Sequence, residues 1–146
     1  MSALVSPIHV EAVGVANIRF FAPPSGGREF PWLSIDDLHA SMTLPRALRR
    51  EFKRSFRSSE WRKDTKAVAT ADGIANIVPH FVAQGLIGAM SEVGYVAPEL
   101  YGRYAAAGAK AMGKLTDGLS PPELLDYIES AWKASGGDPL KRGERQ

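Results

Sequence analysis

The chain has no cysteine among its 146 residues. Disulfide bridges, thiolate metal sites and thiol nucleophiles are therefore excluded. No apolar run approaches the length of a membrane span, and residues 1–10 lack the basic segment and apolar core of a signal peptide. We therefore expect a soluble, cytoplasmic protein that has no membrane partner.

Residues typical of active sites are few and widely separated. His9, His39 and His80 form no metal-ligand spacing. Asp36 and Asp37 lie close to His39, but positions i, i+1 and i+3 do not share one helix face, and acidic residues are common in a capped first turn. The sequence therefore predicts no metal site here.

Recognised catalytic motifs are also absent from the sequence. The stretch 108–116 resembles a phosphate-binding loop, but Leu115 follows Lys114 where that loop needs Ser or Thr. No nucleophile elbow or Ser-His-Asp set is visible. We therefore predict no catalytic residue and no cofactor, and a protein that is not an enzyme.

The charge of the chain is unevenly distributed, although its net value is only +2. Residues 46–66 contain nine bases and three acids, a net charge of +6. The other residues contain nine bases and thirteen acids, a net charge of −4. A basic segment on a mildly acidic body indicates oriented binding to a polyanion.

Six bases recur at helical spacing, and we call them the basic ridge. At about 100° per residue they share one face of a helix. They are Arg46, Arg49, Arg50, Lys53, Arg54 and Arg57. Leu48, Phe52 and Phe56 form a separate apolar stripe that would anchor this helix. Trp61, Arg62, Lys63 and Lys66 extend the positive region as secondary contacts.

The basic ridge is either a nucleic-acid contact or a face that is solvated or binds protein. Charge runs are often solvated faces, and the ridge could also dock an acidic protein. A solvated face is disfavoured, because six neighbouring cations repel one another unless an anion lies nearby. Arginine exceeds lysine five to one in the ridge, and its planar fork suits phosphate oxygens and guanine edges.

The order of predicted elements is typical of an α+β fold, with N-terminal antiparallel strands and a hairpin packed against about five helices. We expect strands within 8–21, an extended segment at 30–33, and a hairpin of 66–70 with 74–78 around Asp72-Gly73. A first helix is expected at 35–41 with Ser34 as its cap, and a second from Arg46 to about 58 with Thr43 as its cap. Three more helices are expected to begin after Pro79, Pro98 and Ser120. Residues 1–137 would form one domain, and 138–146 a charged, disordered tail.

The last two predicted helices each carry a distinctive face. Small residues at 105–109 in the fourth helix would let another helix approach closely, within the chain or in a homodimer. In the last helix, Leu124, Leu125, Ile128 and Trp132 are expected to face inward.

Residues 18–21 (Ile-Arg-Phe-Phe) and 30–38 (Phe-Pro-Trp-Leu-Ser-Ile-Asp-Asp-Leu) resemble the opening of the BRO-N family. These are DNA-binding N-terminal domains of baculovirus BRO proteins and phage antirepressors. The likeness covers about residues 16–115. It departs at the late helix, where Tyr101 or Tyr104 stands in the neighbourhood of the family's tryptophan. The resemblance implies a DNA-binding regulator of phage or mobile-element type.

We therefore predict a transcriptional regulator that binds double-stranded DNA through the basic ridge. The alternative is a protein-binding antirepressor or antiactivator whose basic face docks an acidic partner. Salt-dependent binding is expected in both cases, so the ligand distinguishes them.

Overall fold

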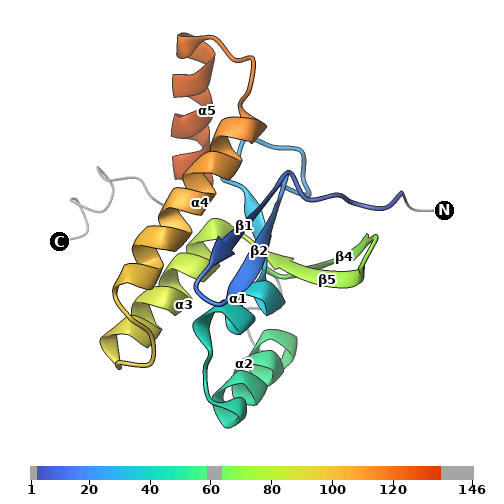
Figure 1. The fold of residues 1–146 in the computed structure, drawn as a ribbon. Coiled ribbons are helices and arrows are strands. Elements are labelled where there is room, and N and C mark those ends of the chain that lie inside the picture. The colour runs from blue at the N-terminus through green and yellow to red at the C-terminus, as the bar shows by residue number, and fades with distance from the viewer. Residues whose placement is uncertain (1–2, 59–63, 136–146) are drawn as a thin grey trace.

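The computed structural model describes residues 3–58 and 64–135, which form an α+β domain (Figure 1). The predicted fold class is confirmed. The strands are β1 His9–Val13, β2 Ala16–Phe21, β3 Trp32–Ser34, β4 Lys66–Thr70 and β5 Gly73–Val78. The helices are α1 Ile35–Met42, α2 Arg46–Ser58, α3 His80–Glu92, α4 Glu99–Leu115 and α5 Pro121–Ala134.

The strands form one antiparallel sheet in the order β1-β2-β3-β5-β4. The short strand β3 lies between the two hairpins, and Leu33 pairs with Phe20 on β2 and with Val78 on β5. The segment predicted as extended therefore joins the β1–β2 hairpin to the predicted Asp-Gly hairpin, and the Asp-Gly hairpin is confirmed.

A tight turn at Gly14 separates β1 from β2. Its φ is +66°, and a Cβ there would lie 2.6 Å from the Ser41 carbonyl oxygen on α1. Glycine is required at this position for both its conformation and its lack of a side chain. The residues predicted as one or two strands are therefore two strands whose turn packs on α1.

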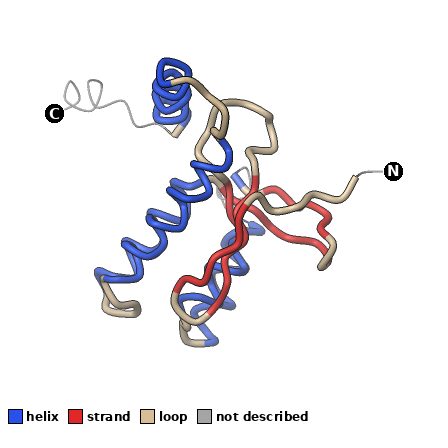
Figure 2. The backbone as a smooth tube through the Cα atoms, turned by 45° about the horizontal axis from the view of Figure 1, so that its top comes forward, coloured by secondary structure: helices blue, strands red, loops and turns tan. Residues whose placement is uncertain are grey.

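The main core lies between the sheet and helices α1, α3 and α4 (Figure 2). Large, fully buried side chains from the sheet and helices meet there. They include Phe20, Leu33, Leu38, Met42, Ile87 and Tyr104. Burial of such apolar surface is the main stabilising contribution to a domain of this size.

Helix α1 is fixed at its start by two polar contacts. The Ser34 hydroxyl accepts a hydrogen bond from the Asp37 amide at 3.2 Å, which confirms the predicted N-cap. The Asp37 carboxylate receives two hydrogen bonds from the Arg19 guanidinium, at 2.8 and 3.1 Å, and a third from the Arg19 amide at 3.0 Å. Asp37 therefore joins α1 to β2.

Thr43 has a different position from the one predicted. It ends α1 in the left-handed conformation, with φ of 50°, and its hydroxyl donates to the Met42 carbonyl at 2.7 Å. Its side chain therefore does not cap α2 as predicted, because the chain turns between the two helices at this residue.

Helix α5 starts as predicted but faces differently. Ser120 and Glu123 form the expected capping box. Leu125, Ile128 and Trp132 are 68%, 41% and 42% exposed, so the inward orientation predicted for them is wrong. Helix α5 contacts the body of the protein through the buried Ala131.

No helix within the described ranges is long and apolar enough to cross a membrane.

Candidate functional site

The candidate site lies on α2, which packs on the body through its apolar stripe. Leu48 and Phe52 are half-buried against the main core. The Phe52 ring stacks on His39 of α1, with ring centroids 5.7 Å apart and planes 20° apart. The predicted apolar anchor is confirmed for these two residues, and it directs the opposite side of α2 to solvent.

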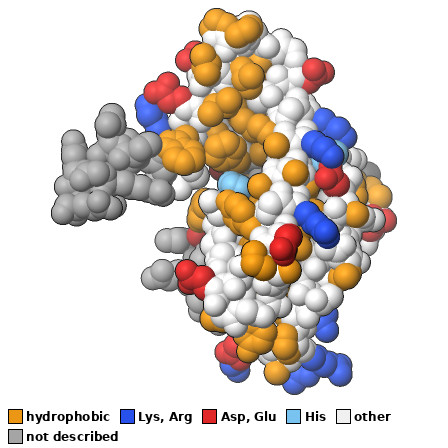
Figure 3. Space-filling view, turned by 60° about the vertical axis from the view of Figure 1, so that its left-hand side comes forward, with side chains coloured by type: hydrophobic (Ala, Val, Ile, Leu, Met, Phe, Trp, Pro, Cys, Tyr) orange, Lys and Arg blue, Asp and Glu red, His pale blue; other side chains and the backbone are white. Residues whose placement is uncertain are grey.

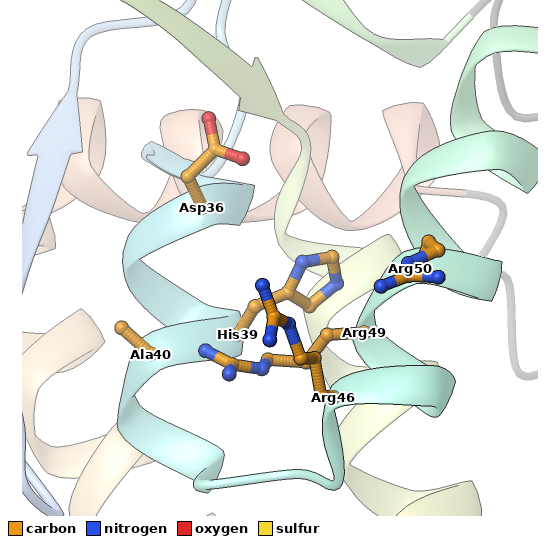
Figure 4. A pocket seen from close by; sticks show the side chains of 6 residues that line it. All are labelled: Asp36, His39, Ala40, Arg46, Arg49 and Arg50. Carbon is orange, nitrogen blue, oxygen red and sulfur yellow. The ribbon is translucent and has the colours of Figure 1, made fainter.

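Three arginines of the basic ridge line one open pocket of about 370 Å³ between α2 and α1. Arg46, Arg49 and Arg50 are all exposed. In Figure 4, Arg46 and Arg49 reach from α2 toward α1 and lie beside His39, while Arg50 lies one turn beyond Arg46. The turn at Thr43 brings α2 alongside α1 and so creates this pocket.

The opposite wall of the pocket comes from α1. Asp36, His39 and Ala40 line it. These residues stand at positions i, i+3 and i+4, which share one face of a helix. That spacing was readable in the sequence, but nothing in the sequence indicated that this face would lie opposite the basic ridge.

The electrostatics of the pocket favour an anion. Its described lining carries three guanidinium groups and one carboxylate, that of Asp36, whose oxygen accepts from the Asn76 side chain at 3.4 Å. Among the described residues, no carboxylate forms an ion pair with Arg46, Arg49 or Arg50. These cations are therefore available to phosphate oxygens.

Arg54, one turn further along the basic ridge, has an acidic neighbour. Its guanidinium donates to both carboxylate oxygens of Glu51, at 2.6 and 2.5 Å. This hydrogen-bonded ion pair lowers the pKa of Glu51 and raises that of Arg54. Arg54 is therefore partly neutralised by Glu51.

Of the other predicted site residues, the structure describes the side chains of Arg54 and Lys66, and neither lines the pocket. Lys66 is exposed at the start of β4. The side chains of Lys53 and Arg57 lie outside the described residues, as do Trp61, Arg62 and Lys63 in full. The structure thus brings three of the ten predicted residues together and places Arg54 on the same helix.

Metal-ligating side chains do not gather elsewhere in the described ranges, where no group of three or more His, Asp or Glu could hold an ion. Asp37 faces Arg19, whereas Asp36 and His39 face the pocket, so the three residues considered in the sequence do not form a ligand set.

Comparisons with family models, with curated proteins and with solved structures found no match to this chain. The resemblance to the BRO-N family therefore stays a prediction from short motifs.

Proposed function

We propose that the protein is a transcriptional regulator that binds double-stranded DNA through the basic ridge, with the arginine pocket holding a backbone phosphate. The observation that carries this proposal is the pocket itself, in which Arg46, Arg49 and Arg50 line one wall. A compact group of guanidinium forks, paired with no carboxylate among the described residues, is well suited to the non-bridging oxygens of a phosphodiester.

The placement of α2 also supports DNA as the ligand. In Figure 1 the helix projects at one end of the molecule, away from α5. Its exposed side can approach a duplex without obstruction from the described body of the protein. Phosphate contacts of this kind position a protein on DNA, and any sequence reading would come from arginine forks that reach base edges.

The BRO-N resemblance suggests the kind of regulator, namely a phage or mobile-element protein that acts on cytoplasmic DNA. It does not supply the target sequence. The proposal for binding therefore depends on the pocket, and the proposal for regulation depends on the resemblance.

Fluorescence anisotropy with a labelled duplex of about two helical turns, at several salt concentrations between 50 and 200 mM, tests the proposal. We expect log K to fall linearly with log salt, by about 0.9 per phosphate contacted. The Arg46→Ala/Arg49→Ala variant should bind on the order of 100-fold more weakly at low salt and flatten the slope by about two units.

A matched variant, Arg28→Ala/Lys133→Ala, removes the same charge from exposed positions outside α2 and should bind within a few-fold of the parent. Equal losses in both variants would show non-specific attraction and contradict the assignment of the site. No duplex binding at 50 mM salt, together with salt-dependent binding to polyglutamate, would instead support the acidic-partner alternative.

A further inference from the structure

The arginine pocket is larger than a single backbone phosphate requires. Its volume is about 370 Å³, within the range of roughly 300–1,000 Å³ that is typical of sites for whole small molecules. A protein that only follows the backbone of a duplex needs cations spread along its surface, whereas Arg46, Arg49 and Arg50 converge on one hollow. The space that a phosphate leaves unfilled is therefore available to a larger part of a ligand.

The two walls of the pocket offer different groups. The α2 wall offers three guanidinium groups, which only donate hydrogen bonds. The α1 wall offers the Asp36 carboxylate, which only accepts them, together with the buried His39 and the methyl group of Ala40. In Figure 4, Asp36 lies one turn of α1 beyond His39, and two of the guanidinium groups reach across to this helix. A ligand that fills the pocket thus needs an anionic group at one end and hydrogen-bond donors at the other.

The Asp36 carboxylate has accepting capacity to spare. It lies half-buried in the first turn of α1, and its Oδ2 accepts a hydrogen bond from the Asn76 side chain of β5 at 3.4 Å. It forms no ion pair with a Lys or Arg in the described part of the chain. The neighbouring Asp37, in contrast, is occupied by its three hydrogen bonds from Arg19. Asp36 can therefore accept from a bound molecule.

The backbone of a DNA duplex matches only the arginine wall. Its phosphodiesters and deoxyribose rings carry no hydrogen-bond donor, so Asp36 would only repel the nearest phosphate. The hydroxyl groups of a ribose do donate to carboxylates, and acidic side chains bind nucleotides in this way. A phosphomonoester carries a charge of about −1.5 to −2 at neutral pH, which suits a group of three guanidinium forks better than the single charge of a diester. The two walls together therefore match the phosphate ester of a ribose.

We propose that the arginine pocket is an effector site for a ribonucleoside monophosphate, whose phosphate binds the three arginines and whose ribose hydroxyls donate to Asp36. In Figure 3, Lys and Arg side chains gather at the lower end of the molecule, where Figure 1 places α2, so anions are attracted to this end. The regulatory consequence rests on the proposed function. Because the same arginines would hold the DNA backbone, the effector competes with the duplex and releases the protein from DNA.

Isothermal titration calorimetry without DNA tests the site by itself. The probes are adenosine 5′-monophosphate and its 2′,3′-dideoxy analogue, which keeps the phosphate and the base but lacks both ribose hydroxyls. We expect the ribonucleotide to bind with a dissociation constant of about 10–100 µM at low salt. The dideoxy analogue should bind on the order of 10-fold more weakly, and Arg49→Ala should weaken the ribonucleotide by a similar factor.

The Asp36→Asn variant separates effector binding from DNA binding, because its two effects have opposite signs. It should weaken the ribonucleotide on the order of 5-fold and remove the preference over the dideoxy analogue. Duplex binding should tighten roughly two-fold, since a carboxylate is lost beside the phosphate-binding arginines. Asp117→Asn, an exposed acid in the turn after α4, is the matched control and should change neither affinity. Circular dichroism checks that both variants remain folded.

The possible outcomes distinguish the effector site from the proposed function. Duplex binding without ribonucleotide binding at concentrations up to about 1 mM would overturn the effector site and leave DNA binding intact. Ribonucleotide binding without duplex binding would support the site and contradict the DNA-binding function. Equal affinities for the ribonucleotide and its dideoxy analogue, or an Asp36→Asn variant that weakens the duplex as much as the ribonucleotide, would also overturn the proposal.

Discussion

Helices α2 and α5 are both amphipathic and of similar length, but the fold uses them in opposite ways. Helix α2 buries its apolar side against α1 and the core, and exposes cations. Helix α5 exposes Leu125, Ile128 and Trp132, and meets the body through Ala131 and a hydrogen bond from Tyr127 to the Glu29 carbonyl at 2.7 Å. The side that remains exposed decides what chemistry each helix offers to a partner.

The difference also separates two kinds of interaction. The exposed cations of α2 would act through long-range, salt-sensitive attraction. The exposed apolar side of α5 would act through short-range burial of surface, which salt does not screen. The same kind of substitution should therefore have different effects in α2 and in α5.

The largest such contrast is expected from removing one apolar side chain from each helix. Phe52→Ala should lower the free energy of unfolding by about 2 kcal/mol, less than a fully buried phenylalanine would lose, because Phe52 is half-buried. Leu125→Ala should lower it by less than about 0.5 kcal/mol. Urea unfolding followed by circular dichroism at low protein concentration measures both values.

Repeating these unfolding experiments at high protein concentration provides the control. The effect of Phe52→Ala should not change with protein concentration, whereas growth of the Leu125→Ala effect would show that another copy of the chain covers α5. A large, concentration-independent effect of Leu125→Ala would show that α5 packs more tightly on its own chain than its exposure indicates.

A smaller change is expected from the acid within the basic ridge. Glu51→Gln removes the carboxylate that holds Arg54, so it should tighten duplex binding roughly three-fold at low salt and steepen the salt dependence. Anisotropy titrations measure this gain. Glu92→Gln, which removes an exposed acid at the end of α3, should leave the affinity unchanged; an equal gain there would indicate net charge alone.

The smallest effect concerns His80 at the start of α3. Its Nδ1 lies 2.8 Å from the hydroxyl of the fully buried Tyr104, and burial lowers the pKa of His80 below its ordinary value of 6.5. The unfolded chain therefore takes up a proton before the folded one, and stability should decrease as the pH falls below about 6.5.

Urea midpoints measured from pH 7.5 to pH 5 would show this decrease. His80→Gln should reduce the pH dependence in that interval, even though it lowers stability overall. An unchanged pH dependence would mean that His80 is as easily protonated in the folded protein as in the unfolded chain.

Much of the fold could be predicted from local patterns. The Asp72-Gly73 hairpin, the Ser34 cap and the capping box at Ser120 each depend on residues close together in the chain. The amphipathic character of α2 was equally visible, because charge and apolar residues repeat at helical spacing. Local interactions determine these features, and the structure confirms them.

Features that depend on how elements meet could not be predicted in the same way. The apolar pattern of α5 predicted an inward orientation for Leu125, Ile128 and Trp132, but the fold places Ala131 and Tyr127 against the body and leaves those three side chains exposed. The α1 wall of the arginine pocket arises because the chain turns at Thr43. No local signal relates Asp36 and His39 to arginines on the following helix.

The clamp between Arg19 and Asp37 gives the arginine pocket a mechanical property. Its three hydrogen bonds tie the first turn of α1 to β2, a strand with neighbours on both sides of it in the sheet. A force applied to α1, which forms one wall of the pocket, is therefore transmitted to the sheet and not to a single loop. The α1 wall of the pocket is therefore anchored to the sheet, and under the proposed function this anchor would oppose the tension that a bound strand of nucleic acid exerts.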